Sequence, residues 1–173
     1  AVEGSVLWLY QDNPYAVQNL RQEAKKRGLD INRLIFAGRV DLPDHLARYK
    51  VADLFLDTSP CNAHTTASDA LWAGLPLLTL VGKSFAARVA ASLLNAVGLQ
   101  DMVVETQEEY ETLAIDIAIN PEKLDAIKAR LKQNLLITPL FDTPLFTKNL
   151  ESAYMQIYKR HQESLLPEHL YIS

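Results

Sequence analysis

Several residue types are scarce in this chain, and each scarcity excludes a class of protein. The 173 residues contain one cysteine, Cys61, so an internal disulfide framework is impossible and a reducing, cytoplasmic location is expected. No apolar run approaches the roughly 20 residues that span a bilayer, and no signal peptide opens the chain, so we expect no membrane partner. The 17 lysines and arginines are scattered among 21 acidic residues, which argues against a nucleic-acid partner.

Several catalytic and nucleotide-binding motifs are also missing from the sequence. Neither a GxGxxG loop nor a Walker loop occurs, which argues against a dinucleotide site or an ATP-hydrolysing site. Ser68 lacks the GxSxG elbow of a hydrolase, and no close spacing of histidine, cysteine and carboxylate supports a metal site. Cys61 and His64 share one loop without an orienting acid, so a nucleophilic pair is not expected.

Alternation of apolar and amphipathic segments is the main positive feature. With 49% hydrophobic and 22% charged residues, the chain has ordinary globular composition and a length that suggests one domain. Short apolar runs separated by amphipathic stretches are typical of a parallel α/β sheet. We expect strands at residues 6–10, 34–36, 54–56 and 76–80, an edge strand at 102–104, and helices at 15–27, 41–50, 64–72 and 85–97.

The second part of the chain is expected to be almost wholly helical from residue 107 onward. Helix breaks are predicted near residues 120–121 and between 139 and 144, and a last amphipathic helix over 147–161 should pack back against something. The fold expected is therefore one lobe over residues 1–173, with a Rossmann-like α/β core over about 1–104 and a helical tail over 105–173. Residues 1–5 lead directly into the first strand, which favours a chain cut from within a larger protein.

The loop and helix start at residues 57–69 are the first candidate binding site. Ligands of open parallel sheets lie beyond the carboxyl ends of the strands, and unpaired N–H groups at a helix start favour an anion. Thr65 and Thr66 could add hydroxyl donors to a phosphate, and Asp69 lies about right to accept hydrogen bonds from a ribose. The alternative is that one of the threonines only caps the helix, with Asp69 favourably placed in its first turn.

A second candidate segment contains His45 and Arg48, three residues apart on one expected helical face. A flat imidazole there could stack on a base while Arg48 pairs with the edge of that base; the alternative is a solvated surface histidine. Lys83, Ser84 and Arg88 are expected to begin the helix after the fourth strand. They would either add positive potential near a phosphate or form a solvated helix start.

Specific segments carry a resemblance to a known family. They are residues 5–9 (SVLWL), 32–36 (NRLIF), 61–66 (CNAHTT), 69–76 (DALWAGLP), 87–92 (ARVAAS), 97–99 (VGL) and 138–141 (TPLF). Together they closely resemble the O-linked N-acetylglucosamine transferases of glycosyltransferase family 41, and the resemblance covers most of residues 4–160. It implies a GT-B enzyme of two Rossmann-like lobes with tetratricopeptide repeats upstream, of which this chain is the carboxyl-terminal lobe.

The resemblance also implies a substrate and a set of donor-binding residues. The donor would be UDP-N-acetylglucosamine, the acceptors Ser or Thr hydroxyls of proteins, and no cofactor or metal would be required. By position, the donor-binding residues would be His45, Arg48, His64, Thr65, Thr66 and Asp69. His45 and Arg48 would contact uracil, and Asp69 would contact the ribose. The diphosphate and its sugar side would be held by His64, Thr65 and Thr66.

Departures from the family pattern bear on activity. Leu42 stands where the family usually has a lysine, and Ala63 where a glycine often precedes the histidine. A glutamine and a lysine that meet the β-phosphate would belong to a strand before the first strand of this chain. Without that cation the departing UDP loses several kcal/mol of stabilisation, so the chain alone is expected to be inactive.

Other functions remain open at this point. A relative that transfers fucose from GDP-fucose has a threonine-rich loop without the histidine, so His64 favours the N-acetylglucosamine branch. A sugar-nucleotide epimerase shares the architecture but should show carboxylate-rich catalytic loops. A non-catalytic sugar-nucleotide-binding scaffold is the alternative that is not an enzyme.

Overall fold

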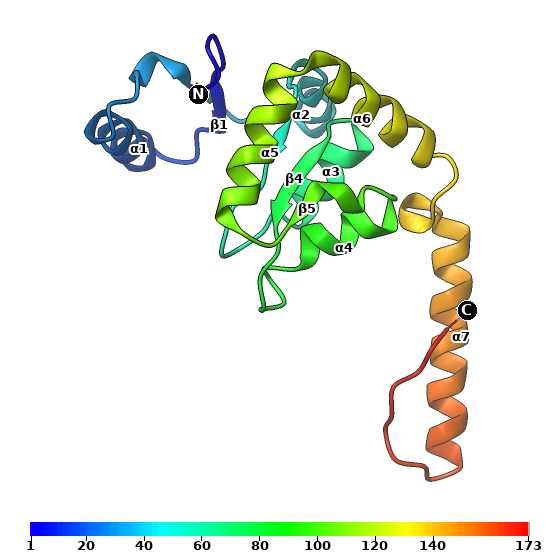
Figure 1. Ribbon diagram of the computed structural model, residues 1–173. Coiled ribbons are helices and arrows are strands. Elements are labelled where there is room, and N and C mark those ends of the chain that lie inside the picture. The colour runs from blue at the N-terminus through cyan, green and yellow to red at the C-terminus, as the bar shows by residue number, and fades with distance from the viewer. Residues whose placement is uncertain (173) are drawn as a thin grey trace.

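The computed structural model describes residues 1–172 and has the expected alternation of strands and helices (Figure 1). The strands are β1 (Leu7–Tyr10), β2 (Leu34–Ala37), β3 (Phe55–Leu56), β4 (Leu77–Leu80) and β5 (Val103–Val104). The α-helices are α1 (Pro14–Lys26), α2 (Leu42–Arg48), α3 (Thr65–Trp72), α4 (Val89–Ala96), α5 (Gln107–Ile119), α6 (Pro121–Asn134) and α7 (Thr143–Gln162). Short 3-10 turns are η1 (Ile31–Arg33), η2 (Tyr49–Val51), η3 (Gln100–Met102) and η4 (Pro139–Phe141).

All strand pairs are parallel, which confirms the α/β class. The strands form two separate sheets, however, rather than one continuous sheet. In the first, β1 pairs with β2, with Leu7 opposite Leu34. In the second, the order is β3-β4-β5, with Phe55 opposite Leu77 and Thr79 opposite Val103. Both β1 and β3 therefore have a single neighbouring strand each.

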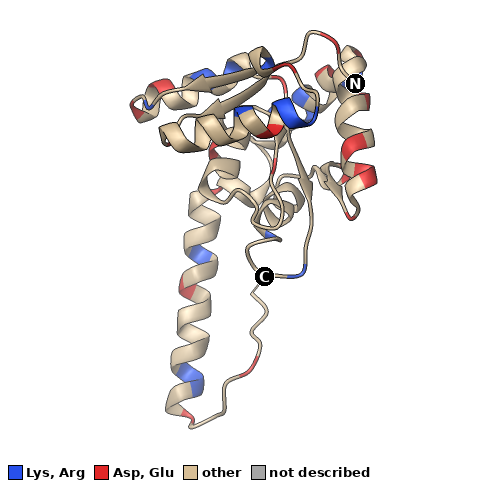
Figure 2. Ribbon diagram, turned by 90° about the vertical axis from the view of Figure 1, so that its left-hand side faces the viewer, with Lys and Arg blue, Asp and Glu red and all other residues tan. Residues whose placement is uncertain are grey.

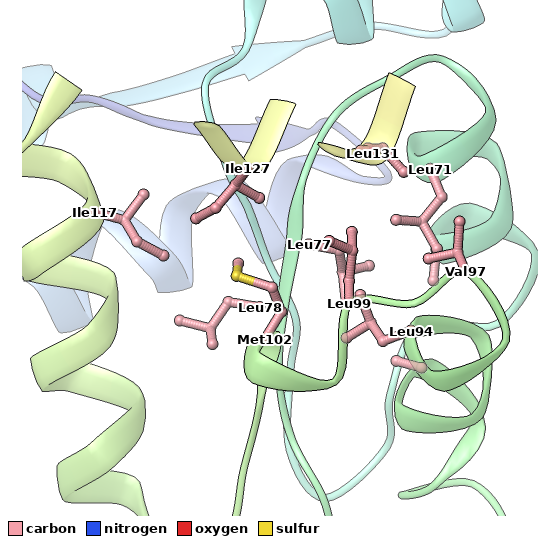
Figure 3. Close-up of a cluster of buried hydrophobic side chains, with 12 residues drawn as sticks. Leu71, Leu77, Leu78, Leu94, Val97, Leu99, Met102, Ile117, Ile127 and Leu131 are labelled. Atoms are coloured by element: carbon pink, nitrogen blue, oxygen red, sulfur yellow. The ribbon is translucent and has the colours of Figure 1, made fainter. Parts of the chain in front are cut away.

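The hydrophobic core surrounds β4, which lies between two layers of helices. Helices α3 and α4 cover one face of the strand and α5 with α6 the other, so Leu77 and Leu78 point to opposite sides (Figure 3). A strand that is buried on both faces is typical of a parallel sheet. The core cluster consists of Ala67, Leu71, Leu77, Leu78, Ala90, Leu94, Val97, Leu99, Met102, Ile117, Ile127 and Leu131. We call residues 42–135, which include it, the body.

Residues 1–41, which we call the N-terminal unit, lie to one side of the body (Figure 1). Helix α1 begins where Asn13 accepts a hydrogen bond from the N–H of Ala16, and it ends before Gly28, whose φ of +73° suits glycine. Arg21 lies over the ring of Phe36 at 5.2 Å, which holds α1 against β2. Ala24 is the one buried residue of this unit.

Helix α4 differs from its predicted range because it begins at Val89 instead of residue 85. Residues 84–88 form turns, in which the N–H of Ala87 bonds to Ser84 and the carbonyl of Ala86 accepts the N–H of Asn62. These hydrogen bonds use backbone groups of Ala86 and Ala87 that a longer helix would need for its own hydrogen bonds. The prediction that Lys83 and Ser84 begin this helix is therefore wrong.

Helix α7 also differs from its prediction, in its start and in its packing. It begins at Thr143 instead of residue 147, because the Asp142 side chain caps it by accepting the N–H of Leu145. It projects away from the body, and acidic and basic residues alternate along it (Figures 1 and 2). None of its residues is buried, and Arg160 only holds the following segment at the carbonyl of Leu166. Within residues 1–172, the helix has no buried residue, so the expectation that it packs back against something is not met there.

Candidate functional site

The loop between β3 and α3 is built around one buried carboxylate, Asp57. Its Oδ1 accepts the N–H groups of Thr58 and Ala63 at 2.8 and 2.7 Å, and its Oδ2 accepts the hydroxyl of Thr79 at 2.6 Å. Tyr110 of α5 donates its hydroxyl to the backbone carbonyl of Asp57 at 2.8 Å. Burial first, and then the charge of Asp57, raises the pKa of Tyr110. Sequence reasoning missed this network.

The start of α3 exposes the groups that an anion would contact. His64 occupies the N-cap position without a side-chain capping bond, and Thr65 and Thr66 follow as exposed residues of the first turn. Neither the N–H nor the hydroxyl of either threonine has a hydrogen-bond partner among residues 1–172. The alternative that a threonine caps this helix is therefore wrong. Unpaired donors at the positive end of a helix favour a negatively charged group.

The loop after β4 borders this helix start on the side of His64. The His64 ring lies edge-on to Phe85 with centroids 6.0 Å apart, and its Nε2 is 3.4 Å from the carbonyl oxygen of Ala86. Lys83 and Arg88 are exposed in the same loop, and Arg88 donates to the carbonyl of Ser84 at 3.3 Å. Two cations thus belong to the segment that touches His64, although their part in binding stays a prediction.

Helix α2 carries His45 and Arg48 in its last turn, and the turn η2 follows it directly. The ring of His45 packs edge-on against Tyr49 at 4.9 Å, and Arg48 donates to the carbonyl of Gly38 at 3.2 Å. Burial raises the pKa of Tyr49, the negative charge of Asp69 raises it further, and Arg48 opposes the effect. Asp69 is therefore close enough to act on the turn that packs against His45. Both His45 and Asp69 are partly exposed.

Two buried polar atoms without partners lie in the predicted binding segments. They are the Nε of Arg48, a donor, and the Oδ1 of Asn62, an acceptor; a third, the Nε of Arg130, lies elsewhere in residues 1–172. Buried polar groups are nearly always hydrogen-bonded, so such atoms call for a partner. Across the same residues, no group of three histidine, cysteine or acidic side chains gathers where a metal ion could bind. The helices described also include none long and apolar enough to cross a membrane.

Parallel strands with flanking helices, an exposed helix start after β3 and a helical tail define a class: a Rossmann-like α/β lobe of the GT-B glycosyltransferase type. The chain belongs to glycosyl transferase family 41, whose family model matches residues 1–150.

Three relatives illustrate how the chain compares with its family. It is 39% identical, over 97% of its length, to an Arabidopsis thaliana protein named probable UDP-N-acetylglucosamine–peptide N-acetylglucosaminyltransferase SEC. A Caenorhabditis elegans protein named UDP-N-acetylglucosamine–peptide N-acetylglucosaminyltransferase is 32% identical over 98% of the chain. The solved structure of a mutant O-GlcNAc transferase from Thermobaculum terrenum matches 92% of the chain with a TM-score of 0.86 and 32% identity. The chain spans 17%, 15% and 31% of these three proteins, respectively.

Proposed function

We propose that this chain is the donor-binding lobe of a UDP-N-acetylglucosamine:protein Ser/Thr O-N-acetylglucosaminyltransferase. The observation that carries the proposal is the exposed first turn of α3, where Thr65 and Thr66 keep both their N–H groups and their hydroxyls free of partners in residues 1–172. Membership of family 41 supports the transferase class, and the names of the relatives support the donor and the protein acceptor.

In this proposal the donor extends from the last turn of α2 to the start of α3. The N–H groups and hydroxyls of Thr65 and Thr66 hold the diphosphate, with His64 beside them on its sugar side. Asp69 accepts hydrogen bonds from the ribose, and His45 and Arg48 hold uracil through stacking and edge contacts. The site assists the reaction by stabilising the negative charge on the departing UDP. In this proposal the donor-binding residues act without a metal or a cofactor.

The isolated chain is proposed to bind the donor without turning it over. Strands β1 and β3 have one neighbour each, which supports a sheet that a further strand of the parent protein completes. We propose that residues 1–173 form one lobe, with an α/β core over about 1–104 and a helical part over 105–173. Its partners would be an amino-terminal catalytic lobe and tetratricopeptide repeats of the same protein, and acceptor proteins, in the cytoplasm.

Titration calorimetry of the chain with UDP, GDP and UDP-N-acetylglucosamine tests the proposed donor. We expect UDP and its sugar conjugate to bind more tightly than GDP, because the names of the relatives indicate a uridine nucleotide donor. Replacing both Thr65 and Thr66 with Val should weaken UDP binding by about tenfold through loss of two hydroxyl donors. Thr112→Val is the matched control, since Thr112 is an exposed threonine on α5, far from the loop in sequence.

Two results would overturn this function. One is equal affinity for UDP and GDP, or no affinity for either, in the full-length family 41 parent protein. The other is a paired threonine variant that binds UDP as tightly as Thr112→Val does, because that would leave the first turn of α3 outside the site.

A further inference from the structure

The side chain of Asp57 lies in the interior, although it belongs to a loop. It immediately follows β3 and is 6% exposed. Among residues 1–172 no lysine, arginine or histidine forms an ion pair with it. Burying an unpaired carboxylate is costly unless hydrogen bonds satisfy its oxygens. Three donors do so here, and two of them are backbone N–H groups of the same loop.

These bonds join the two ends of the loop that leads into α3. Thr58 begins the loop and Ala63 ends it, and both N–H groups meet the same carboxylate oxygen, Oδ1. Two further bonds close the interior of the loop: Asn62 donates to the carbonyl of Thr58 at 3.0 Å, and the hydroxyl of Thr58 donates to the carbonyl of Cys61 at 2.8 Å. The peptide group between Asn62 and Ala63, just before His64, therefore has a fixed orientation.

The carboxylate also ties this loop to the buried central strand of the body. Thr79, which donates to the other oxygen, is fully buried in β4 at the centre of the core. Tyr110 of α5 also donates a hydrogen bond to the backbone carbonyl of Asp57. Asp57, which follows β3, is thus bonded to both β4 and α5. A side chain held by packing and hydrogen bonds on rigid elements can fix a binding group accurately.

We infer that Asp57 is a positioning residue for the donor site: it holds Ala63 so that the N–H groups of Thr65 and Thr66 point at the diphosphate, without touching the donor itself. The inference rests on the proposed function for the identity of the ligand. It does not depend on that function for the claim about the loop, which can be measured without any ligand.

Two substitutions of Asp57 separate hydrogen bonding from charge. An amide in Asp57→Asn keeps an oxygen for Thr58 and Ala63, and its NH2 can donate to the hydroxyl of Thr79, which then acts as an acceptor. Asp57→Ala removes all three bonds. We expect Asp57→Ala to weaken UDP binding by at least about tenfold and Asp57→Asn by less than about threefold. Exchange of the Ala63 amide hydrogen should accelerate by at least about tenfold in the alanine variant only.

A destabilised core variant separates positioning from general loss of stability. Ile127→Val removes a methylene from a buried residue that lies in the core cluster, outside the loop. It should lower the melting temperature and leave both the UDP affinity and the Ala63 exchange rate at the values of the unaltered chain. If Asp57→Ala does not fold, Tyr110→Phe removes one bond to the loop and should speed Ala63 exchange by about threefold.

The outcomes distinguish the two proposals. A folded Asp57→Ala variant whose UDP affinity and Ala63 exchange match the unaltered chain would overturn the positioning role. Equal losses in Asp57→Ala and Asp57→Asn would overturn it as well, because charge and not loop geometry would then be responsible. If the unaltered chain and the full-length parent both fail to bind UDP while Ala63 exchange responds as stated, the donor assignment fails and the loop assignment stands.

Discussion

The N-terminal unit and the body use similar strand sequences with very different results. Strand β1 is apolar on both faces, as β4 is, yet Leu7, Trp8 and Tyr10 are 44%, 38% and 54% exposed whereas Leu77 and Leu78 are fully buried. Strand β4 has two neighbouring strands and helices on both faces, while β1 has one neighbour. Burial is thus decided by what surrounds a strand. A sequence that is apolar on both faces shows only that a strand is suited to the interior of a sheet.

The same contrast extends to the ends of the elements. In the body, Asp57, Thr79 and Tyr110 join the end of β3 to β4 and α5 through one buried and one partly buried hydrogen bond. In the N-terminal unit, the side-chain bonds are exposed or only partly buried, as when Lys26 pairs with Glu23 at 2.7 Å and Arg33 donates to the carbonyl of Val2 at 2.7 Å. Exposed pairs contribute little to stability. We therefore expect the unit to be held to the body weakly and to depend on a further strand for its burial.

Truncating one leucine in each region should give the largest difference. Leu77→Ala empties space at the centre of the core and should cost about 3 kcal/mol of unfolding free energy. Leu20→Ala, at a position 45% exposed on α1, should cost less than about 1 kcal/mol. Urea unfolding followed by circular dichroism measures both. Similar costs in the two variants would mean that α1 is packed as tightly as β4.

Much of this arrangement could be predicted from the sequence, because it depends on local patterns. Apolar runs predicted each strand to within one residue, and Gly28 predicted the end of α1. The start of α4 could not be predicted, since Ala86 accepts a hydrogen bond from Asn62, on another loop. The division of the strands into two sheets could not be predicted either, because the pairing of each strand depends on which other strands are present beside it.

The candidate site shows the same limit. Residues His45 and His64 could be singled out because a histidine at a loop mouth is a local signal, and their binding roles stay predictions. The Asp57 network could not be found this way, since its hydrogen bonds join residues 22 and 53 positions apart. The available signal was an aspartate placed directly after one apolar strand, together with a threonine in the next apolar strand. That signal indicates a pair only once the two strands are known to be neighbours.

Each region contains one of the two tryptophans, which allows its unfolding to be followed separately. Trp8 lies in β1, and Trp72 lies at the end of α3 with its ring 5.1 Å from that of Phe141. We expect Trp72→Phe, which reports on the N-terminal unit, to unfold at a urea midpoint at least about 1 M below that of Trp8→Phe. Fluorescence titrations of both variants measure this. Coincident midpoints that also match circular dichroism would show a single cooperative unit.

Acid titration should give the smallest and most specific difference. Backbone N–H groups of Glu105 and Thr106 lower the pKa of Glu109 in the capping box of α5, and hydrogen bonds from Lys26 and Arg27 lower the pKa of Glu23 on α1. A lowered native pKa contributes stability above the ordinary value of 4.5, and this contribution is lost as the pH falls through the native value.

Because Glu109 belongs to the body, Glu109→Gln should reduce the acid sensitivity of the Trp72 transition by a small amount. Glu23→Gln should leave that transition unchanged and affect only the Trp8 signal, since α1 lies in the other region. Urea midpoints at pH 3.5 and pH 6 in the Trp8→Phe and Trp72→Phe variants measure the effect, which should be small because Glu109 is exposed. A Trp72 transition that responds to Glu23→Gln would show that α1 and the body unfold together.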